Sequence, residues 1–283
     1  MNKIGILYIC TGKYNVFWEK FYQSFEKYFM KDCELHYFVF TDADTVFDEE
    51  NNHRIHRHYL ETLPWPLITL FRFHTFLSIK DELEEMDYLL FSNSNMECVT
   101  EVKFDEMMPR TEKGEALFTV MHPGYFGMKS KYAPLERSAK SYAYVPYRYQ
   151  VPYVIGAMNG GTSKAFLKMA ETLKWATEED LKRNVIARWH DESQLNRYIA
   201  DRDDVRILTP EYCYPFGMDV TYQPRIAAVS KKAKFDVDSF KGVDNTAKPS
   251  KLDGCVRMMN VVLTNLRCLR DTVLNRKVRE YGI

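Results

Sequence analysis

The first sixty positions alternate between apolar runs and one amphipathic stretch. Residues 3–10 form an apolar run of strand length, which breaks at Thr11-Gly12-Lys13. A helix is predicted next from a stripe of aromatic residues at helical spacing, namely Phe17, Phe21, Phe25 and Tyr28. Residues 34–41 form a second apolar run, which ends in a turn at Asp42-Ala43-Asp44. A strand, a helix and a strand in this order predict an α/β sheet.

The same alternation continues along most of the chain. Further strands are predicted at residues 87–92, 114–121, 153–158 and 205–208. Helices are predicted at residues 67–85, from Thr162 or Ser163 to 175, from Thr177 with a capping-box pattern at Asp180, over 195–200, and from Gly254 onwards. Residues 128–150 are rich in tyrosine and irregular, so we expect a lid or an acceptor loop there.

Polar or small residues follow four of the predicted strands. They are Cys10-Thr11, Asn93-Ser94-Asn95, His122 and Asn159-Gly160-Gly161. In α/β sheets, ligands bind beyond the carboxyl ends of the strands. We therefore expect these residues to share one cleft, in which the two glycines either let the backbone approach a ligand or form a turn.

The densest group of polar side chains is Trp189-His190-Asp191-Glu192-Ser193. A tryptophan beside two carboxylates suits a sugar, because the ring stacks on C–H groups and the acids accept hydroxyl hydrogens. The same residues also suit the start of the helix over 195–200, which they would cap and charge. Arg72 stands among apolar positions, so it either extends to the surface or is buried against a carboxylate or phosphate.

Composition narrows the class of protein. The chain has 39 basic and 39 acidic residues, so its overall charge does not point to nucleic acid or membrane. Its six cysteines form no C-x-x-C pair, which argues against a zinc site and for a reducing compartment. No run approaches the roughly 20 apolar residues of a membrane span. We expect a soluble cytoplasmic protein, with 13 basic and 6 acidic residues from Arg225 to the end.

Residues 87–95, Asp-Tyr-Leu-Leu-Phe-Ser-Asn-Ser-Asn, resemble the metal-binding strand of a glycosyltransferase in which asparagine replaces both usual aspartates. Other matching stretches are Gly12-Lys13-Tyr14, Tyr28-Phe29-Met30, Thr41-Asp42, His122-Pro123-Gly124, Gly160-Gly161-Thr162, residues 189–196 and Pro210-Glu211-Tyr212-Cys213. In this order they resemble glycosyltransferase family six, which includes the blood-group A and B transferases and the α-1,3-galactosyltransferases. The resemblance covers residues 3–235, and without an anchor the chain resembles a bacterial member.

The resemblance implies a GT-A fold, a Rossmann-like mixed sheet flanked by helices. We expect one catalytic domain over residues 1–245 and a basic helical tail over 246–283. The implied reaction is a retaining transfer of GalNAc or Gal from a UDP-sugar to the 3-OH of a galactoside, which often carries fucose.

The resemblance also implies roles for individual residues. Glu192 would face the anomeric carbon and Arg72 would bind the donor sugar, and these two are the expected catalytic residues. His122, Trp189 and Glu192 would hold the acceptor. The other expected donor-binding residues are Ile9, Cys10, Thr11, Tyr14, Asn93, Asn95, Ile155, Gly156, Ala157, Asp191 and Lys231.

The asparagines decide the cofactor prediction. Divalent ions prefer charged oxygen ligands, and Asn93 and Asn95 offer neutral amides. We therefore expect no metal, and we expect Lys231, helped by Lys232 or Lys234, to balance the diphosphate charge. The alternative is that these lysines are a solvated surface run.

Three questions stay open at the level of sequence. The small residues Gly156 and Ala157 favour GalNAc over Gal. Loss of both metal carboxylates also fits a catalytically inactive carbohydrate-binding protein, although such a protein has no need of Glu192. The basic helix from Gly254 would dock on the domain, form a dimer, or lie on an anionic membrane surface.

Overall fold

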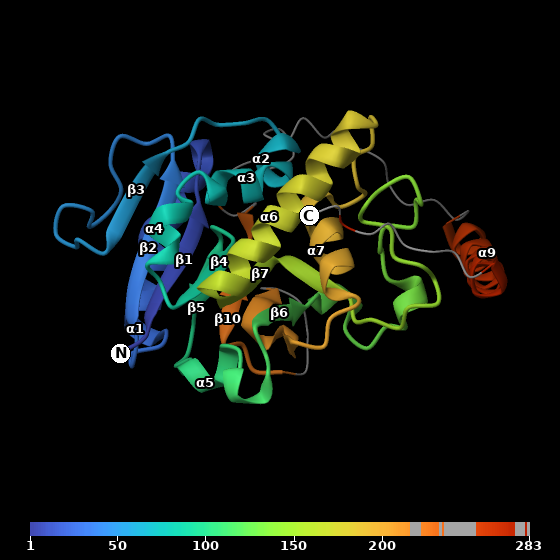
Figure 1. Cartoon of the computed structure of the whole chain (residues 1–283). Coiled ribbons are helices and arrows are strands. Elements are labelled where there is room, and N and C mark those ends of the chain that lie inside the picture. The colour runs from blue at the N-terminus through green and yellow to red at the C-terminus, as the bar shows by residue number, and fades with distance from the viewer. Residues whose placement is uncertain (216–221, 232–233, 235–252, 275–280, 282–283) are drawn as a thin grey trace.

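The computed structural model describes residues 1–215, 222–231, 234, 253–274 and 281. Its main feature is a seven-stranded mixed sheet in the order β3-β2-β1-β4-β7-β6-β8 (Figure 1). The strands are β1 (Lys3–Ile9), β2 (Glu34–Thr41), β3 (Ile55–Tyr59), β4 (Tyr88–Ser92), β6 (Leu117–Met121), β7 (Val154–Thr162) and β8 (Val205–Leu208). β7 runs antiparallel to β4 and β6, whereas the other pairs are parallel.

A second, three-stranded sheet consists of β5 (Met96–Cys98), β10 (Ile226–Ala228) and β9 (Tyr214–Pro215). The helices are α1 (Trp18–Tyr28), α2 (Leu67–Leu70), α3 (Arg72–Leu77), α4 (Lys80–Glu84), α5 (Phe104–Met107), α6 (Ser163–Lys182), α7 (His190–Ile199) and α9 (Asp253–Leu274). Short 3-10 helices are η1 (Gly12–Phe17), η2 (Thr111–Lys113), η3 (Pro123–Tyr125), η4 (Ser130–Tyr132) and η5 (Pro210–Cys213). The expected mixed α/β architecture is therefore confirmed.

The two faces of the main sheet have separate cores. Side chains alternate along a strand, so Ile4, Ile6 and Tyr8 of β1 pack with α1, while Leu7 packs on the other face with α3 and α6. Of the aromatic residues that the sequence placed on one stripe, Phe21 and Phe25 of α1 are fully buried in this core and Tyr28 packs against it, whereas Phe17 lies in the preceding η1. These cores fix the strand ends from which the site is built.

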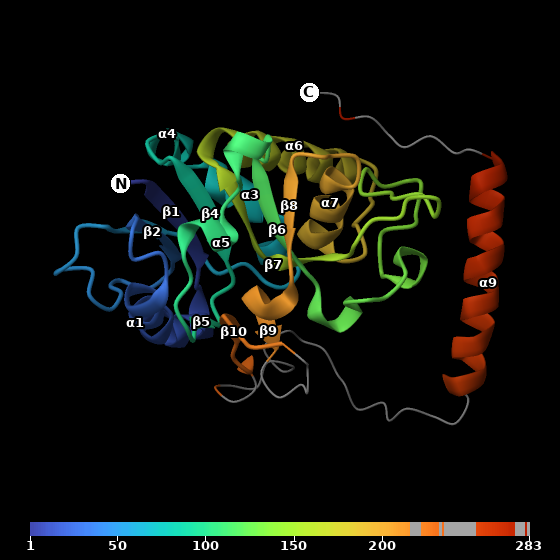
Figure 2. The same ribbon diagram turned by 90° about the horizontal axis from the view of Figure 1, so that it is seen from below.

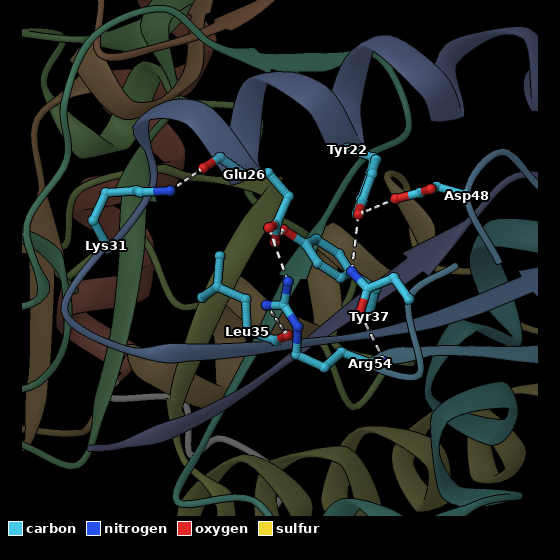
Figure 3. Close-up of polar contacts among 8 residues, drawn as sticks. Tyr22, Glu26, Lys31, Leu35, Tyr37, Asp48 and Arg54 are labelled. Atoms are coloured by element: carbon cyan, nitrogen blue, oxygen red, sulfur yellow. Dashed lines mark hydrogen bonds and ion pairs between the residues drawn. The ribbon is translucent and has the colours of Figure 1, made fainter. Parts of the chain in front are cut away.

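Polar contacts attach α1 to β2 and to the residue that precedes the edge strand β3 (Figure 3). Glu26 of α1 accepts hydrogen bonds from Tyr37 at 2.8 Å and from Arg54 at 2.9 Å. Arg54 also donates to the Leu35 carbonyl at 3.0 Å, and Tyr22 donates to Asp48 at 2.6 Å. These contacts hold α1 against the sheet.

Several predicted elements agree with the structure. The strands predicted at residues 34–41 and 205–208 have those bounds, and Thr162 caps α6 by accepting from the Ala165 amide at 3.3 Å. The helix predicted from Gly254 corresponds to α9, which lies at the outer edge of the molecule beside residues 125–149 (Figures 1 and 2). No helix in the described ranges combines the length and apolarity of a membrane span. The expected domain boundary at 245/246 lies outside the described residues.

The helix predicted over residues 67–85 is divided into α2, α3 and α4. Phe71 (φ −95°, ψ 13°) and Ile79 (φ −121°, ψ 32°) leave the helical region and separate the pieces. The helical period of Leu70, Phe73, Phe76 and Leu83 therefore reflects burial of each piece rather than one continuous rod. The break at Phe71 places Arg72 at the first position of α3.

The turn predicted at Gly160-Gly161 is wrong, because β7 continues through Thr162. A Cβ atom at Gly160 would lie 2.4 Å from the Leu89 carbonyl oxygen, and one at Gly161 would lie 2.4 Å from that of Ala116. The glycines therefore allow close packing in the sheet rather than the approach of a ligand.

The helix predicted to start at Thr177 is also wrong, since both Thr177 and Asp180 lie inside α6. Asp180 does not cap a helix. Its carboxylate accepts from the Tyr142 amide at 2.8 Å and from Gln194 at 3.0 Å, and it also accepts from Ser141. It thereby attaches the tyrosine-rich segment to α6 and α7.

Candidate functional site

A pocket opens where β1 and β4 end side by side. The two strands are parallel neighbours, so the residues after them meet at one edge of the sheet. The pocket is lined by Ile9, Thr11, Tyr14, Thr62, Leu63, Trp65, Ile68, Thr69, Arg72, Phe91, Asn93, Ser94 and Lys231. Among these described residues, Arg72 and Lys231 are the charged ones. The pocket thus combines apolar and aromatic surface with neutral polar side chains and two basic ones.

Asp42, just after β2, holds two loops of the pocket together. Its carboxylate accepts from the Gly12 amide at 2.8 Å and from the Thr62 hydroxyl at 2.7 Å. Partial burial raises the pKa of Asp42, but these hydrogen bonds outweigh burial and the pKa is lowered. Asp42 therefore stays ionised and orders the loops around Thr11 and Thr62.

Arg72 connects the pocket to the start of α7. Its side chain is buried, donates to the Gly156 carbonyl at 3.0 Å and pairs with Asp191. Its guanidinium also lies 4.1 Å from the centre of the Phe91 ring. Of the two alternatives for Arg72, burial against a carboxylate is the correct one.

Glu192 is the second acid of the α7 start, and both of its oxygens are occupied. One accepts from the Gly156 amide at 2.7 Å, and the other accepts from the Tyr153 hydroxyl. Asn196, one helical turn later, donates to the Glu192 carbonyl at 2.9 Å and exchanges two hydrogen bonds with Val154. The carboxylate is therefore fixed to β7 rather than turned to solvent.

Burial raises the pKa of both acids. That of Asp191 is raised to about 6, because desolvation outweighs the nearby charge of Arg72 and the Glu192 charge adds to the rise. The pKa of Glu192 is also raised by burial, against hydrogen bonds from Gly156 and Tyr153. Two adjacent carboxyls with perturbed pKa values beside a pocket are typical of a functional site.

Gly156 lies directly under these acids. A Cβ atom there would lie 3.1 Å from the Glu192 Cβ and 3.5 Å from an Asp191 carboxylate oxygen. The missing side chain thus makes room for the acids of α7. Ala157 is buried in the α1-side core, and Ile155 packs against that core. Neither residue lines the pocket.

A second aromatic group lies on the far side of Glu192. The His122 ring is 4.8 Å from that of Tyr125 and 5.6 Å from that of Tyr153. Burial lowers the pKa of His122, and its Nδ1 accepts from the Gly124 amide at 3.1 Å, so the neutral ring carries its proton on Nε2. Trp189 is 43% exposed, which leaves an aromatic surface open to solvent beside Glu192.

Of the two asparagines that were predicted to bind the donor, only one lines the pocket. Asn93 lines the pocket. Asn95 is buried and donates its amide to the Val229 carbonyl at 2.7 Å, so that it ties β4 to the segment after β10. Lys231 lies two residues after Val229, and its Nζ is 5.1 Å from the centre of the Tyr14 ring. Lys232 lies outside the described residues, and Lys234 is not among the residues that line the pocket.

These residues do not fit a divalent metal ion. Asn93 and Asn95 supply only neutral amide oxygens, whereas such ions favour charged ligands, and Asn95 Oδ1 is buried without a hydrogen-bond partner among the described residues. Across the described ranges, no three His, Cys, Asp or Glu side chains are grouped to hold a metal.

Two further comparisons with the predicted site are informative. Cys10 is fully buried in the α1-side core, where burial raises the pKa of its thiol to about 12, and its side chain does not line the pocket. Tyr153, Thr62 and Trp65 contact the site but were not predicted as site residues. A tryptophan between two prolines, Pro64-Trp65-Pro66, was the available signal in the sequence for Trp65.

The tyrosine-rich segment over residues 128–150 is attached to the site by a buried acid. Glu136 accepts from the Arg188 amide at 2.8 Å and from the Ser138 amide at 2.7 Å. Arg188 precedes Trp189, so the segment supports the start of α7. The prediction that it acts as a lid or acceptor loop stays a prediction.

Comparisons with known proteins identify the family of this chain. The model of glycosyltransferase family 6 matches residues 2–236. The O-antigen biosynthesis glycosyltransferase WbnI of Escherichia coli is 38% identical over 213 residues, which cover 75% of this chain and 88% of that protein. The histo-blood group ABO system transferase 2 of Rattus norvegicus is 27% identical over 217 residues, covering 75% of this chain and 63% of that protein.

A third relative is the globoside alpha-1,3-N-acetylgalactosaminyltransferase 1 of Gallus gallus, which is 28% identical over 217 residues, covering 75% of this chain and 61% of that protein. The chain thus spans about three fifths of the length of these vertebrate relatives. The family match extends over most of the chain and includes every residue of the site described above. This chain belongs to glycosyltransferase family 6, and membership implies the GT-A fold.

Proposed function

We propose that this chain is a retaining transferase that moves GalNAc from UDP-GalNAc to the 3-OH of a galactoside, preferably a fucosylated one, without a metal ion. The observation that carries the proposal is the acid pair of buried Asp191 and half-buried Glu192, held beside the pocket by Arg72 and by β7. A protein that only binds sugar gains nothing from the cost of burying two carboxyls together.

In this proposal the UDP moiety occupies the pocket at the ends of β1 and β4. Tyr14, Ile9 and Ile68 offer apolar surface for the base, and Asn93 hydrogen-bonds the diphosphate or sugar. Arg72 already shares its charge with Asp191, so Lys231 balances the diphosphate in place of a cation. Lys231 thereby offsets the diphosphate charge to a similar extent in the bound donor and during transfer, so it acts mainly on donor binding.

The proposed reaction replaces one glycosidic bond by another. The acceptor O3 forms a bond to the anomeric carbon, the bond from that carbon to the diphosphate oxygen breaks, and UDP leaves with the bonding electron pair. The O3 proton passes to the leaving diphosphate or to solvent. Glu192 faces the anomeric carbon, as a nucleophile that forms a transient ester or as a carboxylate that stabilises the positive carbon. As a nucleophile, Glu192 must first release Tyr153 or Gly156.

The preference for GalNAc no longer relies on the small size of Gly156 and Ala157. Gly156 is explained by the space that Glu192 and Asp191 need, and Ala157 is buried in the core. The support for GalNAc is that one relative is named globoside alpha-1,3-N-acetylgalactosaminyltransferase 1. UDP-galactose remains the second candidate, since another relative is named alpha-1,3-galactosyltransferase 2.

The test is a donor and acceptor screen with excess EDTA. UDP-GalNAc and UDP-Gal are each incubated with a 2-fucosylated galactoside or with the same galactoside lacking fucose, and UDP release and product linkage are measured. We expect the fastest UDP release with UDP-GalNAc and the fucosylated acceptor, unchanged by chelator. Strict dependence on added Mn²⁺ contradicts the metal-free proposal. Acceptor binding without UDP release favours an inactive carbohydrate-binding protein.

A further inference from the structure

Helix α9 exposes its apolar face. Eight of its large apolar side chains are exposed, namely Met259, Val261, Val262, Leu263, Leu266, Leu269, Val273 and Leu274. Leu266 is 58% exposed, Leu269 64% and Val273 74%. In the rest of the described chain, the large exposed apolar residues are spread over many elements. Such a concentration of apolar surface on one helix is typical of an interaction site.

The opposite, more polar side of α9 holds the helix to the protein. Asp271 is buried and accepts from Tyr144 at 2.9 Å, with Arg148 at 3.8 Å, while Asn265 accepts from Lys131. An amphipathic helix that docks on its own domain buries its apolar stripe. Here the stripe that contains Leu266, Leu269 and Val273 faces outward, so α9 presents it to a partner.

A basic groove runs between α9 and the tyrosine-rich segment. We define it by its four cationic lining residues, Lys131, Arg137, Arg188 and Arg267. Among the described residues that line it, none is acidic. Within the described ranges, none of the four forms an ion pair with a carboxylate. Arg137 lies 4.2 Å from the centre of the Tyr147 ring, and its pKa is lowered by burial.

The combination of an outward apolar stripe and an adjacent basic groove selects the class of partner. A second copy of the chain would cover the stripe, but a two-fold interface would also bring the exposed Arg267 and Arg270 of both copies close together. The surface of an anionic bilayer satisfies both features, because acyl chains accept the leucines and headgroup phosphates accept the arginines.

We propose that α9 and the basic groove form a docking site for an anionic lipid surface. α9 lies in the plane of the interface with Leu266, Leu269 and Val273 among the acyl chains, and a lipid phosphate enters the groove between Arg137 and Arg267. The proposal is independent of which sugar the enzyme transfers. The groove also borders Tyr125, which contacts His122. Docking would therefore bring the part of the site that contains His122 close to the lipid surface.

The experiment is sedimentation of the full chain with vesicles of phosphatidylcholine alone or mixed with phosphatidylglycerol. We expect binding to the mixed vesicles and at least about tenfold weaker binding to the neutral ones, with binding lost as salt is raised. Leu266→Asn with Leu269→Asn should reduce partitioning at least about tenfold, and Arg267→Glu with Arg270→Glu should do the same.

Matched controls lie on the far side of the molecule. Tyr59→Asn changes a side chain that is 74% exposed on β3, and Lys20→Glu with Lys27→Glu reverses two exposed charges on α1. These variants should bind vesicles like the unaltered chain. Failure of the unaltered chain to bind anionic vesicles overturns the proposal, and so does conversion of a dimer to a monomer by the leucine variant without vesicle binding. Saturable binding of inorganic phosphate that depends on Arg267, without vesicle binding, overturns the lipid assignment.

Discussion

The two ends of the candidate site differ in charge: one carries two carboxyl groups and the other carries neutral amides. At the start of α7, buried Asp191 and half-buried Glu192 lie side by side, and Arg72, Gly156 and Tyr153 hold their oxygens. At the end of β4, where relatives of this kind are expected to carry two aspartates, the chain has neutral asparagines, one of which serves the protein backbone.

This difference suits a reaction that develops opposite charges at the two ends. Negative charge is kept where a positive sugar carbon would form, although burial makes it costly. It is removed where a negatively charged diphosphate would lie, and Lys231 is nearby. If the proposed function is correct, each end complements the charge that the reaction develops beside it. The four predictions below test this contrast.

The largest effect is expected for Glu192→Gln at the acid end. We expect kcat to fall at least about 100-fold, because the neutral amide cannot stabilise or attack the anomeric carbon. UDP affinity, measured by calorimetry, should change less than about threefold. Glu84→Gln on the exposed part of α4 is the matched control. Near-normal turnover of Glu192→Gln removes this residue from the mechanism.

The second prediction concerns pH and Asp191. Its pKa is raised to about 6 in the folded chain from the usual 3.8, so the folded state keeps this proton at pH values where the unfolded state has lost it. The stabilising contribution is therefore full below about pH 4 and is lost as pH rises through 6. Relative to Asp191→Asn, the unfolding free energy should fall by about 3 kcal/mol across this window.

Urea unfolding of both chains at several pH values between 4 and 7.5 measures this difference. Asp81→Asn, an exposed change on α4, should leave the pH dependence unaltered. A difference between Asp191→Asn and the unaltered chain that stays flat with pH contradicts the assignment.

The third prediction addresses the asparagine end through stability. Asn95→Asp replaces a buried amide donor by a carboxylate that faces the Val229 carbonyl. We expect a loss of about 2 kcal/mol in unfolding free energy, because two acceptors are brought together in a buried position. Asn93→Asp, at a half-buried position in the pocket, should cost less than about 1 kcal/mol. Equal costs at both positions would show that the Asn95–Val229 contact does not matter.

The smallest effect is expected for Lys231→Gln. Loss of the positive charge should raise the KM for the UDP-sugar about tenfold, while the KM for the acceptor stays the same. Lys231→Arg should recover most of the donor affinity, and Lys164→Gln on exposed α6 should have no effect. An unchanged donor KM in Lys231→Gln would mean that another group balances the diphosphate.

Patterns along single strands and helices could be predicted from the sequence, and so could the acid end of the site. Arg72 and Asp191 were both identified, although 119 positions separate them. The prediction that Cys10 binds the donor placed its side chain on the wrong face of the sheet, and the alternation along β1 could have shown this. Ile4, Ile6 and Tyr8 point into the α1-side core, and a period of two places Cys10 on the same side.

Tyr153 and the role of Asn95 could not be predicted in this way. Each depends on a partner from a distant element, Glu192 and Val229, whose position is set by how β7 and the segment after β10 pack. Likewise, the glycines of β7 were indistinguishable from a turn until the neighbouring carbonyls of Leu89 and Ala116 were placed. Single-sequence patterns report periodicity, whereas these contacts depend on register across the sheet.

Gly156 limits how this lineage can change by mutation. The amide of this residue binds Glu192, and the space above its Cα is filled by the Glu192 Cβ. A Cβ atom there would require Glu192 to shift by a few tenths of an ångström, so a substitution acts on the acid as well as on the shape of a sugar pocket. Changes in sugar preference that leave the acid in place are therefore expected at other lining positions, such as Ile68 or Thr69.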